Sequence, residues 1–366
     1  MEPASEIVHR LIDAGLLSTG DVVDGRLTVV DLSRSNAVCL VDAGGAGRFV
    51  AKVAAPDRDD LQGSGAVETM LYERIAADPV LAATAPVPRL VGRFGTLIVL
   101  APVGQSDSLL RRLRDRGPTA ADGRLLGEAL GRWRAVGSVL PTSGLPGRLP
   151  WVAGALGDTP PQFLGEHPAT RRLGQLLAGQ AVLGGALTEL ARHWRRDGVM
   201  HGDVRWDNVV VTDDPEVGRE RALLVDLEFA DLGDGAWDVA GAVAEPLAVA
   251  VTSSVAGGGG EGGVDVTDRR TVGRHLRELR PFVACFAAAY RAAAGPPADE
   301  DLRRGMAFVP ARLVQAAFQY AAWDPSSGVA AGLALAGLAA GLRVDDRLLA
   351  GMLAQPVAAL AGRGSP

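Results

Sequence analysis

The sequence predicts an α+β protein of two lobes, a small β-rich lobe over residues 1–103 and a larger helical lobe over residues 104–366. Two patterns support this division. Short runs of β-branched residues, separated by turn-forming residues, fill most of the first hundred positions. After about residue 105, apolar residues recur mainly at helical spacing. A length of 366 residues also exceeds one typical hydrophobic core and favours about two structural units.

Five strands and one helix are expected in the first lobe. The strands are predicted over residues 27–30, 37–41, 49–53, 89–91 and 96–100. A helix is predicted over residues 65–78, because Val67, Leu71 and Ile75 share one helical face. Pro86 and Pro88 prevent this helical segment from continuing, because proline has no backbone N–H and cannot extend a helix.

Helices dominate the predicted second lobe. They are expected over residues 120–136, 169–196, 267–293, 301–322, 328–342 and 345–361. A short β region interrupts them at residues 208–211 and 222–225. The segment GGGGEGG, residues 257–263, has the composition of a flexible surface loop.

The charge balance argues against one class of function. Of the 37 basic side chains, 36 are Arg and the single Lys is Lys52. The formal net charge is −6, whereas a nucleic-acid binder is typically strongly basic. A hydrophobic content of 48% indicates a packed globular protein. We therefore expect no nucleic-acid partner.

The sequence predicts a cytoplasmic protein without a membrane partner. Two cysteines, Cys39 and Cys285, are too few for a disulfide framework or a four-cysteine zinc site. The amino terminus carries acids and no apolar run typical of a secretory signal. The nearest candidate for a membrane span, residues 329–342, is shorter than the ~18 residues required and is predicted to be a core helix.

Chemically reactive groups gather around residues 199–211, VMHGDVRWDNVVV. Asp203 lies five residues before Asn208, and eighteen residues further on an apolar strand ends at Asp226. A strand–loop–strand unit of this kind brings these three side chains to one point. Carboxylate and amide oxygens are ligands that Mg²⁺ prefers, and a free carboxylate can accept a proton from a hydroxyl. The spacing alone is weak evidence, because Asp and Asn are common in loops.

The lone lysine adds a second group of functional residues. Lys52 lies inside the strand predicted over residues 49–53, and Glu68 follows sixteen residues later on the predicted helix. A strand cation held by a carboxylate of the packed helix can point at a phosphate. Glu73, on the same helix, is the alternative partner.

In this order of residues the chain resembles the aminoglycoside phosphotransferase and choline kinase-like family, which is related to the protein kinases. The resemblance rests on His201-Gly202-Asp203 followed by Asn208, and on Asp226-Leu-Glu228, with Lys52 and Glu68 upstream. It covers about residues 20–345. It implies a bilobal protein-kinase-like fold that binds ATP and Mg²⁺ in the cleft between the lobes.

The resemblance also implies a role for each residue of this set. Lys52 contacts the α- and β-phosphates, and Glu68 orients it. Asp203 positions the acceptor hydroxyl and accepts its proton. Asn208 and Asp226 hold Mg²⁺. Catalysis then consists mainly of positioning and charge neutralisation.

The resemblance assigns the contact with adenine and the covering of the nucleotide to other segments. Backbone groups near Leu100 and Val103 form the hinge that meets adenine. Ser33 and Ser35 belong to the loop over residues 31–36, which covers the nucleotide. This loop is not glycine-rich, and Asp226-Leu-Glu replaces Asp-Phe-Gly. Both departures fit the small-molecule branch better than the protein kinases.

Four residues in or near the loop over residues 201–208, called the catalytic loop, have further expected roles. Arg205 is expected to act in catalysis, because Ser/Thr protein kinases carry a Lys there that touches the transferring phosphate. The small-molecule branch commonly has His at this place. His201 is expected to pack the loop and Asp238 to hold it by hydrogen bonds. Glu228 either reaches the metal or is an exposed loop acid.

The sequence leaves the acceptor open. Residues 265–366 carry 12 Arg and 9 acids, a balance that does not favour a polycationic aminoglycoside. The Trp206-Asp-Asn208 ending and the Arg-rich lobe resemble kinase-type enzymes of peptide natural-product pathways. A Ser or Thr of a precursor peptide is slightly favoured over a small-molecule hydroxyl of an antibiotic or sugar. A partner protein of the same pathway is also considered.

Two alternatives come from other classes of protein. A catalytically inactive kinase fold would act as a binding module and keep the fold without turnover. Metal-dependent hydrolysis by the Asp cluster without ATP would leave Lys52 and Glu68 unexplained.

Overall fold

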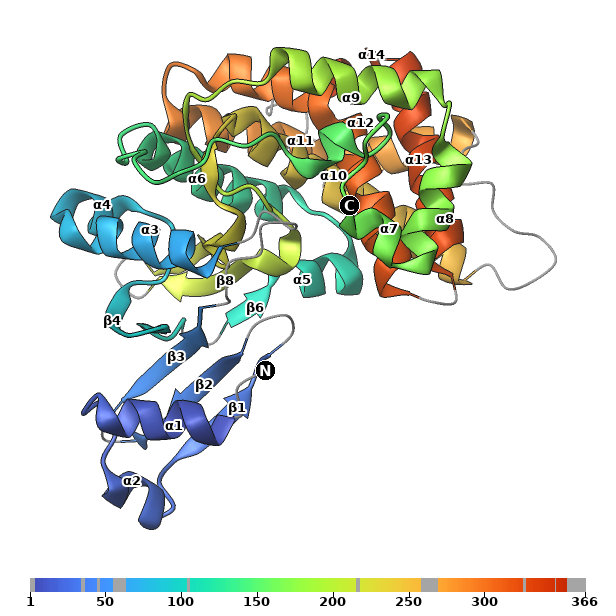
Figure 1. The fold of residues 1–366 in the computed structure, drawn as a ribbon. Coiled ribbons are helices and arrows are strands. Elements are labelled where there is room, and N and C mark those ends of the chain that lie inside the picture. Colours follow the sequence, from blue (N-terminus) through green and yellow to red (C-terminus); the bar gives the residue numbers. More distant parts are fainter. Residues whose placement is uncertain are drawn as a thin grey trace.

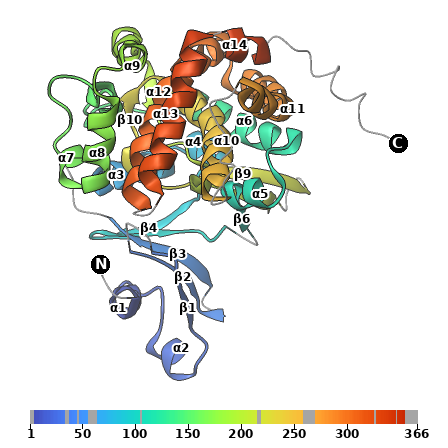
Figure 2. The same cartoon turned by 90° about the vertical axis from the view of Figure 1, so that its right-hand side faces the viewer.

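The computed structural model confirms the α+β fold of two lobes (Figure 1). It describes residues 4–33, 37–44, 47–54, 64–103, 106–214, 218–257, 269–324, 327–345 and 347–353. Figure 2, turned by a right angle, shows the amino-terminal sheet with α1 and α2 on one side and the helices of the second lobe on the other. Of the predicted glycine-rich loop only Gly257 is described, and the end of the predicted helix 345–361 also lies outside the described residues.

The first lobe is built on a five-stranded antiparallel sheet of order β1-β2-β3-β5-β4. Its strands are β1 Thr28–Asp31, β2 Val38–Asp42, β3 Arg48–Val53, β4 Leu90–Phe94 and β5 Leu97–Leu100. All five predicted strands are present. In β3, Phe49 and Ala51 face one core, while Val50 and Lys52 face the space between the lobes. The sheet therefore presents Lys52 toward the second lobe from its central strand.

This lobe contains more helix than the sequence indicated. The predicted helix is α3, Gly65–Ala77, but α1 Ala4–Asp13, α2 Thr19–Val23 and α4 Pro79–Thr84 are additional. The expectation of one helix was wrong. In α1, Ile7 and Leu11 lie four residues apart and are fully buried against the sheet. α2 and α4 span too few turns to give a period in the sequence.

Helices make up most of the second lobe. They are α5 Leu109–Arg116, α6 Ala120–Gly137, α7 Phe163–Glu166, α8 Pro168–Leu177, α9 Ala181–His193, α10 Gly235–Gly257, α11 Arg269–Ala294, α12 Ala298–Trp323, α13 Gly328–Val344 and α14 Arg347–Leu353. The helix predicted over residues 169–196 is two helices, α8 and α9. Gly179, with a φ of 80°, lies between them, and this left-handed conformation ends the first helix.

Glycine spacing brings α6 and α11 into close contact. A Cβ on Gly123 would lie 2.2 Å from the carbonyl oxygen of Phe282, and one on Gly127 would lie 2.3 Å from that of Phe286. Two glycines four residues apart thus form a flat strip on α6 against which the α11 backbone packs.

Short strands carry the loops with the reactive groups. β7 Gly198–Met200 pairs with β10 Asp231–Gly233, and β6 Ser106–Ser108, β8 Val209–Asp214 and β9 Arg219–Leu224 form a second small sheet. β8 and β9 confirm the predicted β region. Asp203 lies in the loop between β7 and β8, and Asp226 lies between β9 and β10. The two loops therefore leave adjacent short sheets.

The apolar helix α10 is part of the core. Within the described residues, only its segment Gly235–Val255 is by itself long and apolar enough to span a membrane, with 67% of its most apolar window buried inside the protein. It packs against α12 and α13. Residues 329–342, the nearest candidate in the sequence, lie in α13, which packs against α12 and α10.

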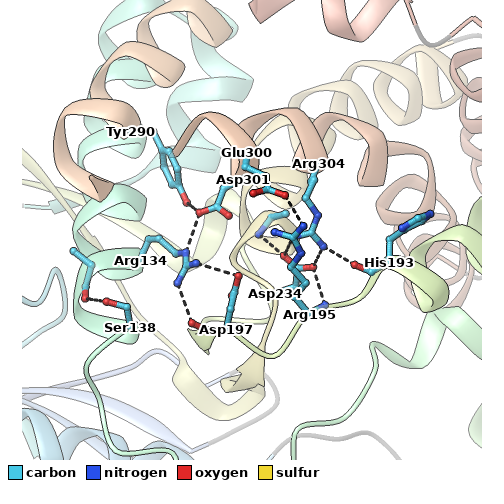
Figure 3. A network of polar contacts seen from close by, with 12 residues as sticks. Arg134, Ser138, His193, Arg195, Asp197, Asp234, Tyr290, Glu300, Asp301 and Arg304 are labelled. Carbon is cyan, nitrogen blue, oxygen red and sulfur yellow. Dashed lines mark hydrogen bonds and ion pairs between the residues drawn. The ribbon is translucent and has the colours of Figure 1, made fainter. Parts of the chain in front are cut away.

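A buried ionic network ties α6, α11 and α12 to the strands beneath the catalytic loop (Figure 3). Arg134 Nε lies 2.9 Å from Asp301 Oδ2, and Arg134 Nη2 lies 3.1 Å from Asp197 Oδ2. Tyr290 donates its hydroxyl to Asp301 Oδ2 at 3.2 Å. Arg304 forms an ion pair with the buried Asp234, directly after β10. The network therefore holds the start of β7, next to Asp197, and the end of β10, next to Asp234.

Asp301→Ala is expected to lower the free energy of unfolding by about 3–5 kcal/mol, because it leaves the buried Arg134 without its main partner. Urea denaturation measures the change. Asp299→Ala, which removes an exposed pair with Arg291, is the matched control on the same helix, and about 0–1 kcal/mol is expected for it. Equal effects of the two substitutions would contradict the assigned role of the network.

Candidate active site

A cavity of about 1420 Å³ lies between the two lobes. The strands β2, β3 and β5 line one side of it, and the loops around β7–β10 line the other. Its walls include the five polar residues identified from the sequence, Lys52, Glu68, Asp203, Asn208 and Asp226. The structure therefore brings this set together around one space.

Lys52 is held between two carboxylates. Its Nζ lies 2.7 Å from Glu68 Oε2 and also forms an ion pair with Asp226. Only 6% of Lys52 is exposed. Burial lowers its pKa, but the charges of Glu68 and Asp226 outweigh this effect and raise it above its usual value. Lys52 therefore stays charged and is fixed in direction.

Glu68, and not Glu73, is the partner of Lys52. Glu68 is 1% exposed, and its Oε1 accepts a hydrogen bond from the backbone N–H of Leu227 at 3.2 Å. Burial raises the pKa of Glu68, while Lys52 opposes that effect. Glu73 instead pairs with Arg93 at the surface, at 3.0 Å. The alternative partner considered from the sequence is thus wrong.

The catalytic loop is anchored from α10. Asp238 accepts hydrogen bonds from the backbone N–H groups of His201, at 2.7 Å, and Gly202, at 2.9 Å. His201 Nε2 lies 3.0 Å from the carbonyl oxygen of Val225, which links this loop to the one that carries Asp226. Both residues have the structural positions expected from the sequence.

Asp203 is a buried, ionised carboxylate. Its Oδ1 lies 3.2 Å from Arg312 Nη2. Asn208 Nδ2 donates to the carbonyl oxygen of Asp203 at 3.1 Å and to its Oδ2 at 3.3 Å. Burial raises the pKa of Asp203, but the charges of Arg312, Arg205 and His201 outweigh burial and hold it below its usual value. Asp203 can therefore accept a proton at neutral pH.

Asp226 has a strained backbone. Its φ of 67° is the only positive φ of a non-glycine residue in the described parts of the chain. Such conformations persist where the surrounding structure imposes them, often at functional sites. The short helix Leu227–Phe229 follows directly, and Ser64 N donates to the carbonyl oxygen of Glu228 at 2.7 Å. α3 and this loop are thus linked.

Asn208 and Asp226 fit a Mg²⁺ ion by the chemistry of their donors. Asn208 uses its Nδ2 toward Asp203, which leaves its amide oxygen as a ligand. Lys52 meets Oδ1 of Asp226, and the carboxylate has a second oxygen. The described residues contain no cluster of three or more His, Cys, Asp or Glu able to bind a metal. Mg²⁺ commonly takes only one or two protein ligands, with phosphate and water completing the site.

The predicted adenine and loop residues are only partly at the cavity. Leu100 and Val103 line it, together with Leu40 and Val50 of the sheet. Ser33 does not line it; its Oγ accepts a hydrogen bond from Val38 N at 3.0 Å and closes the turn between β1 and β2. Ser35 lies outside the described residues. Leu32, the neighbour of Ser33, does line the cavity, so the expected nucleotide-covering role of this loop stays a prediction.

The sequence model of the Phosphotransferase enzyme family matches residues 26–282. The chain belongs to this family. The match covers well over half of the sequence and includes every polar residue of the set around the cavity. The predictions of family and of an ATP-dependent phosphotransferase are confirmed. A search of the curated proteins finds no significant match.

Solved structures resemble this phosphotransferase in fold. The ethanolamine kinase of Plasmodium vivax has 13% identity and a TM-score of 0.53 over 90% of this chain and 85% of its own. The choline kinase of Cryptosporidium parvum Iowa II has 10% identity and a TM-score of 0.52 over 95% and 98%. A mutant of aminoglycoside 2′-phosphotransferase-IIIa in complex with GDP has 16% identity and a TM-score of 0.51 over 94% and 98%.

The far end of the phosphotransferase cavity contains residues that the sequence did not indicate. Its walls include the aromatic residues Trp151, Phe163, Phe318, Tyr320 and Trp323. Arg205 lies here, with its Nη2 2.5 Å from Asp207 Oδ2 and its guanidinium carbon 4.3 Å from the centre of the Trp323 ring. Its expected contact with the transferring phosphate stays a prediction. Glu228 also lines the cavity.

Glu245 of α10 is the other unexpected residue in this wall. Within the described residues, no side chain forms a hydrogen bond or ion pair with it. Burial raises its pKa to about 7, although the charge of Arg205 opposes the shift. The next residue, Pro246, has no N–H for the carbonyl of Ala242, and Trp206 Nε1 donates to that oxygen instead, at 3.1 Å. No local motif marks Glu245, because only the packing of α10 against the catalytic loop brings it here.

Proposed function

We propose that this phosphotransferase moves the γ-phosphate of ATP to a hydroxyl group of a small molecule that carries a single amine. The observation that supports the proposal is the continuity of the cavity. Lys52, Asp226, Asp203 and Glu245 all line it. The paired Lys52 and Asp226 mark what we call its nucleotide end, and Glu245 with the neighbouring Arg205 marks what we call its acceptor end. ATP and the acceptor can therefore be bound in one cavity at the same time, with the base Asp203 in the same cavity.

Each residue of the site has a distinct task in this reaction. Lys52, held by Glu68, contacts the phosphates of ATP and fixes their direction. Asn208 and Asp226 would hold Mg²⁺, which would supply further positive charge to the phosphates. Asp203 orients the acceptor hydroxyl and takes its proton as the oxygen attacks the γ-phosphorus and the bond to ADP breaks. The positioning of the reactants and the stabilisation of negative charge on the transferring phosphoryl group account for the rate enhancement.

The charges at the acceptor end favour one positive group. Arg205 is already paired with Asp207, and Asp203 with Arg312. Glu245 remains as the carboxylate without such a pair. An ammonium group near Glu245 would stabilise its charged form and could also contact aromatic rings of the wall. A polycationic aminoglycoside would find too few acids.

The aromatic lining of the cavity favours a small acceptor over a peptide. Phe163 and Phe318 pack edge-on against Trp151, with ring centroids 5.3 and 6.1 Å apart, and form a continuous aromatic wall. The two kinases from Plasmodium vivax and Cryptosporidium parvum are named for ethanolamine and choline, each of which is an amino alcohol. Their fold and the wall here support the same acceptor class. A Ser or Thr of a precursor peptide is the alternative outcome of the test.

We also propose that the protein works in the cytoplasm. ATP is available there, and Cys39 and Cys285 are both free, as a reducing compartment requires.

An acceptor panel tests the proposed function. Mg-ATP is incubated with ethanolamine, choline, glucosamine, glucose, kanamycin and a Ser/Thr-rich peptide, and phosphate gain is measured by mass spectrometry. We expect phosphate on a compound with one amine and none on the peptide or glucose. Phosphorylation of the peptide alone would contradict the proposed acceptor class.

A pH series identifies the group that recognises the amine. Glu245 is neutral below its pKa of about 7 and charged above it, so KM for the amine is expected to fall as pH rises through about 7. Glu245→Gln should raise KM about tenfold at pH 8 and remove this dependence, with KM for ATP unchanged. Glu189→Gln, on the surface of α9, is the control, for which the wild-type profile is expected. A wild-type pH profile in Glu245→Gln would exclude this residue as the amine site.

A further inference from the structure

Arg312, on α12, contacts the proposed base directly. Its Nη2 donates to Asp203 Oδ1 at 3.2 Å and to the carbonyl oxygen of Val204 at 3.3 Å. Its guanidinium carbon lies 5.2 Å from the centre of the Trp237 ring. Arg312 is 5% exposed and is not among the described residues that line the cavity. It therefore reaches the reaction only through the residues of the catalytic loop.

The structure around Arg312 is shaped to admit it. A Cβ on Gly241 of α10 would lie 2.6 Å from the carbonyl oxygen of Val204 and 3.3 Å from Arg312 Nε. Only a glycine allows the helix, the loop and the guanidinium to meet there.

Arg312 leaves one of its hydrogen-bond donors unused, which is unfavourable for a cation with a purely structural role. Its Nη1 is buried and has no hydrogen-bond partner in the described parts of the protein. Burying a charge with an unmet donor costs stability, and a well-packed apolar residue would avoid this cost. The pair with Asp203 is thus the contact that accounts for an arginine at this place.

We propose that Arg312 is a positioning residue that holds Asp203 by Oδ1 and directs Oδ2 to the acceptor hydroxyl. This inference rests on the proposed function, since it takes Asp203 as the base. Asn208 Nδ2, 3.3 Å from Oδ2, restrains the carboxylate from its other side. A carboxylate held at both oxygens has one orientation before the acceptor arrives, which lowers the cost of reaching the reactive geometry.

The test compares Arg312→Met and Arg312→Lys with Arg303→Met, an exposed arginine of the same helix. Turnover is followed as ADP formed from Mg-ATP, with water as the acceptor or with any panel compound that raises the rate. Arg312→Met should lower kcat about 10²-fold and leave KM for ATP within twofold, because the change removes the contact that orients Asp203 and none of the contacts of Lys52. Arg312→Lys should recover part of the lost kcat, because its ammonium group can still donate to Asp203 but lacks the fixed geometry of the guanidinium. Arg303→Met should match the wild type.

Three outcomes decide the inference. A wild-type kcat in Arg312→Met would overturn it. A kcat of Arg312→Lys as low as that of Arg312→Met would also overturn it, because a second donor to Asp203 would then be without effect. If Arg312→Met does not fold, as judged by thermal denaturation, Arg312→Lys decides: a rise in its KM for ATP as large as the fall in its kcat contradicts the inference. Full activity of Asp203→Asn would instead refute the proposed function.

Discussion

Lys52→Arg is expected to lower phosphoryl transfer by about 10²-fold or more while the protein still folds. Lys52 is nearly enclosed between Glu68 and Asp226, and the buried Tyr72 lines the same part of the cavity. A guanidinium is a planar fork that is larger than an ammonium and cannot occupy this position as a compact point charge. The phosphate of ATP would then meet a displaced cation. Steady-state kinetics and the melting temperature measure the two effects.

The control for this change lies on the same strand. Arg48→Lys exchanges the same two residue types at a half-exposed ion pair with Asp42, and no loss of turnover is expected. The chain uses arginine in 36 of its 37 basic positions, so lysine at position 52 stands against the preference of the whole sequence. Near-normal turnover of Lys52→Arg would show that lysine is there by chance.

Asp226→Asn is expected to abolish the stabilisation of the protein by Mg-ATP. Asn has the same size and tolerates the left-handed backbone at φ 67°, so the change removes charge with little strain. Mg²⁺ would lose its only charged protein ligand in the proposed site. A ligand at 100 times its Kd stabilises a folded protein by about 2.7 kcal/mol, which a thermal-shift assay detects readily.

Asp213→Asn, on the exposed edge of β8, is the matched control and should keep the wild-type shift. A catalytically inactive binding module would give a different result for the wild type. Mg-ATP would stabilise it, but no turnover would be observed. Retention of the full Mg-ATP shift in Asp226→Asn would contradict the assigned metal site.

The sequence predicted the nucleotide end of the site because its residues lie in short local patterns. Asp203 and Asn208 share one loop, and Asp226 follows the second of the two strands after it, so one strand–loop–strand unit places them together. Lys52 and Glu68 lie on a strand and a helix of one small lobe. The helical period gave α3 correctly, but it did not distinguish Glu68 from Glu73. The surface pair of Glu73 with Arg93 of β4 settles that choice.

The acceptor end depends on packing between distant helices, which a single sequence does not reveal. Arg312 lies 109 residues after Asp203, on a helix whose period shows which face is apolar but not which loop it meets. Glu245 reaches the cavity through the close approach of α10 to the catalytic loop at Gly241. Ser33, expected in the loop that covers the nucleotide, accepts a hydrogen bond from Val38 N, a local contact that the sequence pattern did not indicate.

Phosphate transfer by Asp203→Asn tests the central claim most directly. The purified wild type, Asp203→Asn and the control Asp213→Asn are compared with Mg-ATP and the best acceptor of the panel, by product mass and by ADP formed. A loss of about 10²–10⁴-fold in kcat is expected for Asp203→Asn, with KM for ATP unchanged and Asp213→Asn fully active. Full activity of Asp203→Asn would contradict the assignment of this residue as the base and, with it, the proposed mechanism.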